Sequence, residues 1–558
     1  MDKIILKIGM IVMALLSFLP MTAYDFEVDG IQYEIISTAD LTCRTSGLGD
    51  TSLSTINIPA TVEYKGKELT VVSVYGFAGT DIEEVTLPNT CTSIGGFEDC
   101  KNLKKISIPS SLTSISSYAF EDCTSLSEIH LPPTLSYIGK SAFSGCTNLE
   151  NVHISDLKAW CNISFTPGWC YSEWDTYTSN PLSNGKAKLL VDDTLLTCLN
   201  TNELDIDKIE AGCFVGYQYL TSVLLDDNIT SVGEYAFWNC SNLKYIQIGK
   251  NIEQIPYACF GECPNLSEVY ISDSESPLLL HASEYSYYDY NGAFRGSNLK
   301  NVYIGRDLTC LSFSSSATHV YSPFQGQNIE YVEIGPLVNS ITKFYFFGVY
   351  TSSGSGSGVS IQNLTIDEST ESIKIDSESF KNIDLVSLFI GRDFNSTTKV
   401  TSYLPGCKSL ENLTIGKYVT KVKYFGFDQN PNISKIECFA INPPSSGEFA
   451  KDTYLDASLI VPYGSKDEYS NANIWKNFWN ISEMELSGIA EITSNSELIN
   501  FELTGNGIKS LCDNKFDIYR IDGQKIVSRI LYNGEILTLH PGIYLVCCDN
   551  KFNKISIR

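Results

Sequence analysis

Hydrophobic positions recur along this chain at a fixed interval, most regularly between residues 97 and 154. A phenylalanine, a cysteine three residues later and a leucine three residues after that return every 23 residues, beginning at Phe97, Phe120 and Phe143. Within each period a short segment alternates, as where apolar Ile129 and Leu131 flank a polar residue, which is typical of a strand with one buried face. A period of this length indicates a solenoid, in which a coil buries its apolar side only by stacking on its neighbours. We therefore predict a β-rich solenoid of about 23-residue repeats with a parallel sheet on one face.

The same period predicts how far the solenoid extends. It resumes at Phe214, Phe237 and Phe260 and becomes irregular further along the chain. We assign residues 76–441 to the repeats, with insertions at about 155–204, 272–292 and 349–358. The first insertion fits either a ligand-gripping loop or, as we favour, a packed plug over the coil edge, because it concentrates aromatic side chains: Trp160, Trp169, Tyr171, Trp174 and Tyr177.

Distinct segments are predicted on both sides of the repeats. Residues 1–23 place two lysines before an apolar run from Ile8 to Leu19, as signal peptides do. Residues 24–75 alternate in short runs with hairpin signals at Asp29-Gly30 and Lys65-Gly66, so we expect a β cap over the first coil. Residues 442–486 are expected to close the far end of the stack, because they supply apolar area from three aromatic residues: Trp475, Phe478 and Trp479.

The repeat resembles one known family. Residues 119–143 follow the pattern Ala-Phe-x-x-Cys-x-x-Leu-x-x-Ile-x-(Ile/Leu)-Pro and then Leu-x-x-Ile-Gly, which is similar to the leucine-rich repeats of the BspA-like family of bacterial cell-surface proteins. The start YDFEVDGIQYEI, the segment 154–193 and the run 458–484 resemble the mature N-terminus, an insertion and the array end of such proteins. The resemblance implies a leucine-rich repeat solenoid, and it implies function less directly, because repeat scaffolds host many partners.

The tail, residues 487–558, shows strand runs around a hairpin signal at Asp522-Gly523. It resembles the small C-terminal β-sandwich that serves as a secretion and sorting module in proteins of the same bacterial group. This second resemblance implies export across the outer membrane.

The net charge of the chain limits the classes of partner that it is expected to bind. The chain has 39 Lys and Arg against 65 Asp and Glu, which gives a formal net charge of −26. Nucleic acids and anionic membranes are bound through clustered Lys and Arg, and the sequence has no such cluster. Past Leu19 no apolar run is long enough to cross a bilayer. We expect neither nucleic-acid binding nor membrane insertion.

The 18 cysteines do not have the spacing of a disulfide framework. Five of them occupy equivalent positions in successive coils, and a ladder of equivalent positions cannot pair uniformly, so we predict buried, reduced thiols: Cys100, Cys123, Cys146, Cys240 and Cys263. Cys161 and Cys170 lie off this ladder and are the best candidates for a disulfide, whose state stays open.

Few residues suggest a catalytic or metal-binding site. The chain has five histidines and no HExxH, GxSxG, P-loop or EF-hand pattern. His130 and His153 share one outward strand position in adjacent coils, which fits a metal pair or, as we favour, a solvated surface pair. We therefore expect no enzyme, no catalytic residue, no cofactor and no metal.

The outward strand positions predict a binding face. Residues that alternate with the buried ones point onto the exposed side of the sheet, and in four neighbouring coils they form an aromatic group bordered by acids. Exposed tyrosines with few lysines have the composition of an interface core, although tyrosine also favours strands in general. The candidate ligand-binding residues are Tyr245, Glu268, Tyr270, Tyr303, Tyr331 and Glu333.

Together these patterns indicate a binding protein. We expect an exported monomer, secreted or at the cell surface with the periplasm as a further location, that binds a protein or glycan on host matrix or on another cell. The family resemblance implies adhesion. A glycan-binding envelope protein and a structural envelope component without a specific ligand are the alternatives.

Overall fold

A computed structural model gives the fold of the chain. It describes residues 24–166, 179–256, 258–280, 293–310, 327–341, 359–375, 385–396 and 407–484, short pieces between 319 and 404, and the strands within 501–557. The chain forms two compact units, residues 1–484 and residues 485–558. The signal-peptide prediction falls on residues 1–23, which lie outside the described residues.

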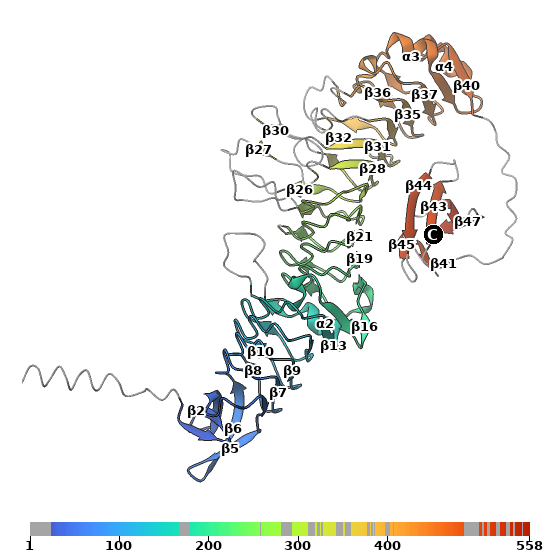
Figure 1. Cartoon of the computed structure of the whole chain (residues 1–558). Helices are drawn as coiled ribbons and strands as arrows, with labels where there is room; N and C mark the ends of the chain where they lie inside the picture. Colours follow the sequence, from blue (N-terminus) through green and yellow to red (C-terminus); the bar gives the residue numbers. More distant parts are fainter. Residues whose placement is uncertain are drawn as a thin grey trace, which may run out of the picture. The chain divides into compact units, whose positions relative to one another are not determined.

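Each coil of the first unit contributes one strand to a wide face, and the strands follow one another along the unit in chain order (Figure 1). The wide face consists of three sheets, in which all neighbours are parallel except β15 and β16. Their strands are β4 (Thr55–Asn57), β7 (Glu84–Thr86) and β9 (Lys105–Ser107); β11 (Glu128–His130), β13 (Asn151–Ile154), β15 (Lys188–Val191) and β16 (Thr194–Leu195); and β17 (Cys198–Asn200), β19 (Ser222–Leu224), β21 (Tyr245–Ile248), β23 (Glu268–Ile271), β25 (Asn301–Ile304), β28 (Asn328–Ile334), β31 (Ser360–Ile366), β33 (Ser387–Ile390), β35 (Asn412–Ile415), β37 (Lys435–Cys438), β39 (Ser458–Val461) and β40 (Asn480–Glu483).

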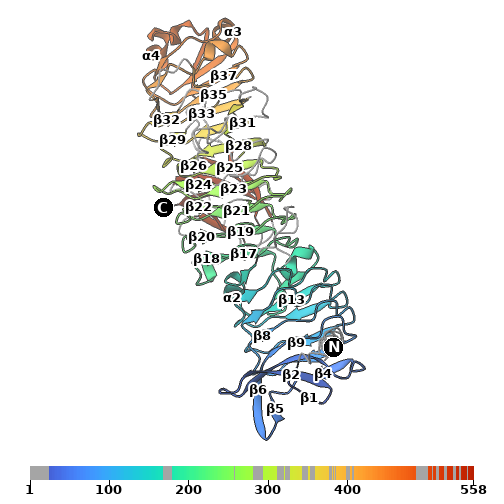
Figure 2. The same ribbon diagram turned by 90° about the vertical axis from the view of Figure 1, so that its left-hand side faces the viewer.

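A second, narrower row of short strands runs beside the wide face, as Figure 2 shows for β18 to β26 next to β17 to β25. These strands also pair in parallel from coil to coil. They are β8 (Ser93–Ile94), β10 (Ser114–Ile115), β12 (Tyr137–Ile138), β14 (Ser164–Phe165), β18 (Lys208–Ile209), β20 (Ser231–Val232), β22 (Gln254–Ile255), β24 (Leu278–Leu280), β26 (Leu308–Cys310), β29 (Ser340–Ile341), β32 (Ile373–Ile375), β34 (Phe394–Asn395), β36 (Lys421–Val422) and β38 (Ser445–Ser446). Strands β27 (His319–Val320) and β30 (Tyr350–Thr351) form a separate antiparallel pair.

The space between the two rows is filled by the residues that define the sequence period. The rings of Phe97, Phe120 and Phe143 stack at centroid distances of 5.7 and 5.4 Å, and Phe214, Phe237 and Phe260 repeat the arrangement at 5.4 and 5.2 Å. All six side chains are buried. The predicted architecture, a β-rich solenoid with a parallel sheet on one face, is confirmed.

The cysteine ladder is buried beside the phenylalanines. The Cys123 thiol donates a hydrogen bond to the carbonyl oxygen of Phe97 at 3.1 Å, and Cys146 does the same to Phe120. All five predicted ladder cysteines are buried free thiols. Burial raises the pKa of Cys146 and of Cys263 to about 12, so these thiols stay protonated and unreactive at neutral pH.

The first insertion continues the solenoid with helices in place of regular coil segments. It contains α2 (Leu157–Cys161) and the 3₁₀ helices η2 (Pro181–Asn184) and η3 (Thr201–Glu203), and it also supplies β14 and β15 to the two faces. Trp160 is 1 % exposed and packs edge-on against Phe165, which favours the packed-plug interpretation over a ligand-gripping loop for this residue. Trp169, Tyr171, Trp174 and Tyr177 lie outside the described residues.

Cys161 does not support the candidate disulfide. It is a buried free thiol, and it lies next to the Cys213 thiol. Cys170 lies outside the described residues.

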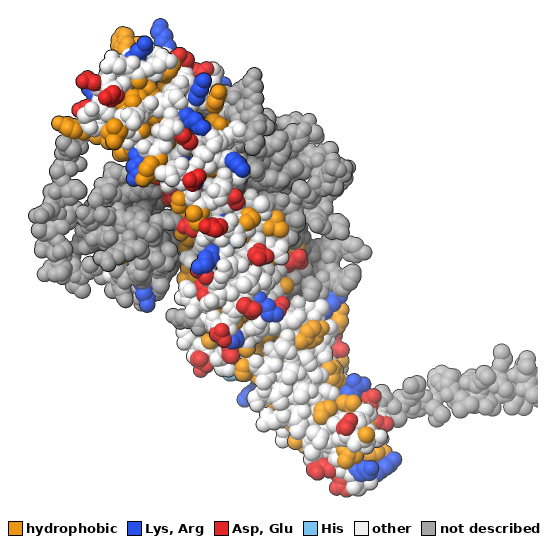
Figure 3. All heavy atoms as spheres, turned by 180° about the vertical axis from the view of Figure 1, so that it is seen from behind, with side chains coloured by type: hydrophobic (Ala, Val, Ile, Leu, Met, Phe, Trp, Pro, Cys, Tyr) orange, Lys and Arg blue, Asp and Glu red, His pale blue; other side chains and the backbone are white. Residues whose placement is uncertain are grey.

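On the face seen in Figure 3, acidic and basic side chains lie side by side. Several ion pairs join neighbouring coils, as at Lys104–Glu83, Lys250–Asp227 and Lys300–Glu330, with nitrogen–oxygen distances of 2.7, 2.7 and 3.3 Å. Exposed pairs of this kind contribute only about 0–1 kcal/mol each. The core therefore matters more to stability than these pairs do.

The chain before the first regular coil forms hairpins: β1 (Phe26–Val28), β2 (Ile31–Ser37), β3 (Thr42–Leu48), β5 (Thr61–Tyr64) and β6 (Lys67–Val74). Asp29-Gly30 and Lys65-Gly66 have positive φ at both residues, as tight hairpin turns need, which confirms both turn predictions. Strand β6 then pairs in parallel with β8 and leads the sheet into the solenoid.

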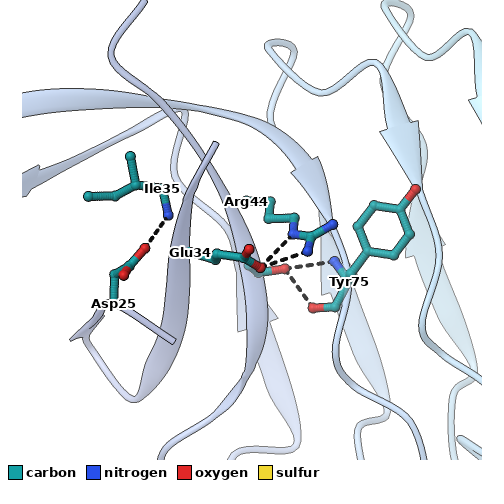
Figure 4. A network of polar contacts seen from close by, with 6 residues as sticks. Asp25, Glu34, Ile35, Arg44 and Tyr75 are labelled. Carbon is teal, nitrogen blue, oxygen red and sulfur yellow. Dashed lines mark hydrogen bonds and ion pairs between the residues drawn. The ribbon is translucent and has the colours of Figure 1, made fainter. Parts of the chain in front are cut away.

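A polar network fixes these hairpins to the first coil (Figure 4). The Arg44 guanidinium donates two hydrogen bonds to Glu34 Oε2, at 2.9 and 2.7 Å. The buried Thr45 hydroxyl donates to the Tyr75 carbonyl at 2.8 Å and accepts from the Tyr75 amide at 2.9 Å. Because Thr45 lies in β3 and Tyr75 directly follows β6, these bonds join β3 to the end of β6.

The far end of the array carries α3 (Lys451–Asp456), α4 (Lys466–Asn471) and η5 (Trp475–Asn477), whereas η4 (Phe427–Gln429) lies before β37. Trp475 is 1 % exposed and donates its indole hydrogen to the Pro444 carbonyl at 2.6 Å, and Phe478 is buried beside it. Trp479 was expected to join them, and this expectation is wrong: it is 77 % exposed. It directly precedes β40, where alternation turns its side chain away from Phe478.

The second unit consists of two antiparallel sheets. The strands are β41 (Phe501–Thr504), β42 (Gly507–Ser510) and β45 (Ile536–Thr538) in one sheet, and β43 (Asn514–Arg520), β44 (Lys525–Leu531), β46 (Gly542–Cys548) and β47 (Lys551–Ile557) in the other. Phe501 of the first sheet and Phe516 of the second meet edge to face at 5.9 Å, so the two sheets share a core.

A motif that the sequence analysis did not single out, Ile-Gly-Arg-Asp, occurs at Ile304–Asp307 and again at Ile390–Asp393. Arg392 is buried and donates to the carbonyls of Gly335 and Pro336, two coils earlier, at 2.7 and 2.8 Å. Arg306 makes equivalent bonds to Gly249 and Lys250. These guanidiniums satisfy carbonyls at the ends of wide-face strands, where the ladder no longer does.

The ladder thiols should be unreactive in the folded protein. We predict that native protein will not be alkylated by iodoacetamide at Cys100, Cys123, Cys146, Cys240 and Cys263, and that denaturation without reductant will expose all five as thiols in mass-spectrometric mapping. Cys123→Ser should lower the free energy of unfolding by about 1–3 kcal/mol, because a more polar hydroxyl is left in a dry interior. The exposed Ser127→Ala is the control. Disulfides at the ladder positions would contradict the prediction.

The buried arginines should stabilise more than surface charges do. Arg392→Met keeps most of the side-chain volume but leaves the Gly335 and Pro336 carbonyls unpaired, so chemical denaturation should show a loss of about 1–3 kcal/mol. Lys417→Met, which removes an exposed partner of Glu368, should cost no more than about 1 kcal/mol. Equal effects of the two substitutions would show that the carbonyl contacts contribute little.

Candidate binding face of the long sheet

Four neighbouring strands of the twelve-stranded sheet carry the candidate residues. The inward positions Ile246, Val269, Val302 and Val332 are at most 2 % exposed and attach β21, β23, β25 and β28 to the core. The outward positions form two parallel rows, in the register expected from the sequence: Tyr245, Glu268, Asn301 and Tyr331 in the first, and Gln247, Tyr270, Tyr303 and Glu333 in the second.

The second row contains a stacked tyrosine pair. The rings of Tyr270 and Tyr303 are 4.5 Å apart between centroids and within 9° of parallel. Both residues are half-buried. Because one ring comes from each of two adjacent strands, the stacking direction follows the ladder, and the pair directs its ring edges, not its ring faces, away from the sheet.

Hydrogen bonding fixes the end of this pair. The Tyr303 hydroxyl donates to Asp273 Oδ1 at 2.8 Å. Position 335 lies against the same hydroxyl, where a Cβ atom would come within 2.5 Å of it, so only glycine fits without a shift of the ring. Burial, followed by neighbouring phenol and carboxylate groups, raises the pKa of Tyr270 and Tyr303 well above the ordinary value. Both hydroxyls therefore stay protonated and able to donate.

The first row is less uniform than the sequence suggested. Tyr331 is 55 % exposed, and Glu268 is half-buried. Tyr245 was expected to be an exposed ring, but it retains only 7 % of its surface, and its hydroxyl lies 3.4 Å from Gln247 Oε1. The expectation of an exposed aromatic side chain is therefore wrong for Tyr245, although its outward register is as predicted.

Two acids at strand ends belong to this region and were not singled out from the sequence. Asp273 lies two residues after β23, and Asp367 directly follows β31 and is 4 % exposed. Burial lowers the pKa of Arg392, and the Asp367 carboxylate opposes that shift, which places Asp367 in the electrostatic environment of the buried guanidinium. The sequence signal that could have identified Asp273 and Asp367 is an acidic residue within two positions after the isoleucine that ends a strand.

The described part of the chain includes no helix long and apolar enough to cross a membrane. The described outward rows thus combine aromatic edges, hydroxyl donors and carboxylates on a rigid ladder. Such a surface can contact a macromolecule over several coils.

Comparison with known proteins identifies the repeat. The family model described as BspA type leucine-rich repeat region matches residues 70–166, 193–351, 290–442 and 373–496. No curated protein matches the chain.

Three of the similar solved structures come from bacteria. One from Bacteroides ovatus is 17 % identical, covering 83 % of this chain and 100 % of that chain, with a TM-score of 0.26. A leucine-rich cell surface protein from Faecalibacterium prausnitzii is 16 % identical, covering 74 % and 94 %, with a TM-score of 0.31. The pneumococcal vaccine antigen PcpA is 15 % identical, covering 83 % and 98 %, with a TM-score of 0.25.

The matched residues, 70–166 and 193–496, include every wide-face strand from β7 to β40 except β15. The chain belongs to the BspA-type leucine-rich repeat family.

Proposed function

We propose that this chain is a secreted or cell-surface protein that binds a macromolecular partner through the wide face of its long sheet, and that this binding serves adhesion to host or matrix proteins or to other cells. Membership in a leucine-rich repeat family of bacterial surface proteins supports the general role. The stacked pair of Tyr270 and Tyr303 is the observation that carries the choice of surface.

The chemistry of the face favours a protein partner. Tyrosine is enriched at the centres of protein interfaces, because it supplies a large contact area with a hydrogen-bonding tip and few rotatable bonds. Tyr331 offers an exposed ring, Glu333 lies two residues further along the same strand, and Glu268 lies beyond Asn301 in the first row. A partner with Lys or Arg side chains would complement these acids, in keeping with the net charge of −26.

A glycan partner is the second candidate, and the ring geometry makes it less favourable. Sugars stack on the open faces of aromatic rings. Tyr270 and Tyr303 cover one face of each other and direct their edges outward. Among the rings of the two rows, Tyr331 is the one that remains well exposed, and a single platform favours a weak saccharide site.

The remaining parts of the proposal follow the sequence resemblances. Residues 1–23 act as a signal peptide, and the two-sheet unit of residues 485–558 acts as a sorting module for export. The mature chain works as a monomer, as a binding protein without catalytic activity.

The tyrosine pair can be tested once a ligand is in hand. The mature chain serves as bait against host extracellular matrix and mucus, and surface plasmon resonance with the captured ligand then compares variants. Tyr270→Ala and Tyr303→Ala should each weaken binding by about 1–3 kcal/mol, because each removes half of a central aromatic contact. Tyr331→Ala should act in the same direction.

Thr86→Ala is the matched control, because Thr86 occupies the equivalent outward strand position on β7, in another sheet of the wide face several coils away, and is exposed. Thermal unfolding of each variant shows whether the fold is intact. If all four variants bind as wild type does, the binding site lies elsewhere on the chain. Binding of isolated saccharides on a glycan array that is lost in Tyr331→Ala would support the glycan candidate instead.

A further inference from the structure

Three side chains with metal-ligand chemistry meet on the wide face of the second sheet, away from the tyrosine pair. His130 on β11 pairs in register with His153 on β13, and Glu128 lies two residues before His130, on the same face of the same strand. One ligand atom from each of Glu128, His130 and His153 lies within 4.8 Å of the other two. From the sequence alone, His130 and His153 fitted either a metal site or a solvated surface pair.

The first observation that favours a metal site over a solvated surface pair is a third potential ligand, Glu128. The two imidazole rings stack at 4.2 Å between centroids, within 12° of parallel, as any two rings on adjacent strands could. Glu128 adds a carboxylate within reach of both rings. Two imidazoles and one carboxylate form a ligand set found in zinc sites, whereas calcium and magnesium prefer oxygen ligands alone.

The second observation is a carboxylate behind one ring. Asp193, in the turn between β15 and β16, places Oδ1 3.0 Å from His153 Nδ1. A carboxylate accepts the hydrogen bond, so Nδ1 is the donor, and in the neutral imidazole Nε2 then keeps its lone pair for a metal. Histidines that bind metals commonly donate their other ring hydrogen to a carboxylate in this way, which fixes the tautomer and the ring orientation.

The backbone beneath the cluster is rigid. Ile129 and Val152, between the ligand positions, are at most 1 % exposed, and the Leu131 amide donates to the His153 carbonyl at 2.9 Å. Bonds of about 2.0–2.1 Å in a tetrahedral zinc site require ligand atoms about 3.4 Å apart. The side chains must therefore rotate so that their ligand atoms come closer together around one ion. The side chains of Glu128 and His130 are exposed, so core packing does not prevent this rotation.

We propose that Glu128, His130 and His153 bind one zinc-like divalent transition-metal ion on the wide face, with Asp193 as the positioning residue of His153. Three protein ligands leave at least one position of a tetrahedral ion for water or for a group of another molecule. The strongly acidic chain attracts cations in general, and the two imidazoles give the site its preference for transition metals.

Isothermal titration of the full mature chain with Zn²⁺, after removal of metals with EDTA and dialysis, tests the proposal. We expect one zinc ion per chain, and His130→Gln or His153→Gln should each weaken its affinity at least about tenfold. Asp193→Asn should weaken affinity about tenfold or more, as is typical when the hydrogen-bond partner of a metal-bound histidine is lost. Mg²⁺ should not compete.

Glu84→Gln is the matched control, because Glu84 occupies the position of Glu128 on β7, where Thr86 replaces the histidine; it should bind zinc as wild type does. Electron paramagnetic resonance with Cu²⁺ provides a second readout, in which wild type should show two nitrogen ligands and His130→Gln one. Equal zinc affinity of wild type and the His130→Gln, His153→Gln double variant would overturn the proposal, as would zinc binding by wild type no tighter than millimolar. Circular dichroism of the metal-free variants verifies that each is folded.

Discussion

Stacking of equivalent side chains from one coil to the next is the constraint on which the rest of the solenoid depends. Within each regular run of repeats the phenylalanine rings stack on one another, at 5.2–5.7 Å between centroids from Phe97 to Phe143 and from Phe214 to Phe260. Ring contacts of this kind are satisfied only when successive coils are in phase. The interior stack therefore sets the register of both strand rows, because the strands lie at a constant chain distance from each phenylalanine.

The thiols and arginines meet a second requirement of this architecture. A coil with short strands leaves carbonyl groups inside or at the edge of the core, and buried carbonyls need partners. Cys123 and the other ladder thiols bond to the carbonyl of a preceding phenylalanine, and Arg306 and Arg392 bond to carbonyls two coils back. Small thiols suffice where the coils are regular. The guanidiniums occur in the less regular half of the array, where a longer reach is needed.

Periodicity made the interior predictable from the sequence, because a residue at a repeated position has the same neighbours in each coil. Phe120, Cys123 and Ile129 could be placed in the core, and Tyr270 and Tyr303 on one outward row, by counting alone. Contacts between different positions of the repeat could not be placed in this way. The Tyr303–Asp273 bond and the Asp193 carboxylate beside His153 depend on residues in turns whose length varies between coils. Trp479 was misplaced for a related reason, since the array end no longer follows the repeat.

Hydroxyl-radical footprinting of the chain, free and bound to a partner captured from host matrix, tests most directly whether the tyrosine rows form the binding face. Oxidation of Tyr270, Tyr303 and Tyr331, measured by mass spectrometry, should be lower in the complex than in the free chain. Tyr137 and Tyr424, which are 40 % and 47 % exposed at positions outside the two rows, should be oxidised equally in both states. Unchanged oxidation of Tyr331 together with protection of Tyr137 or Tyr424 would contradict the account.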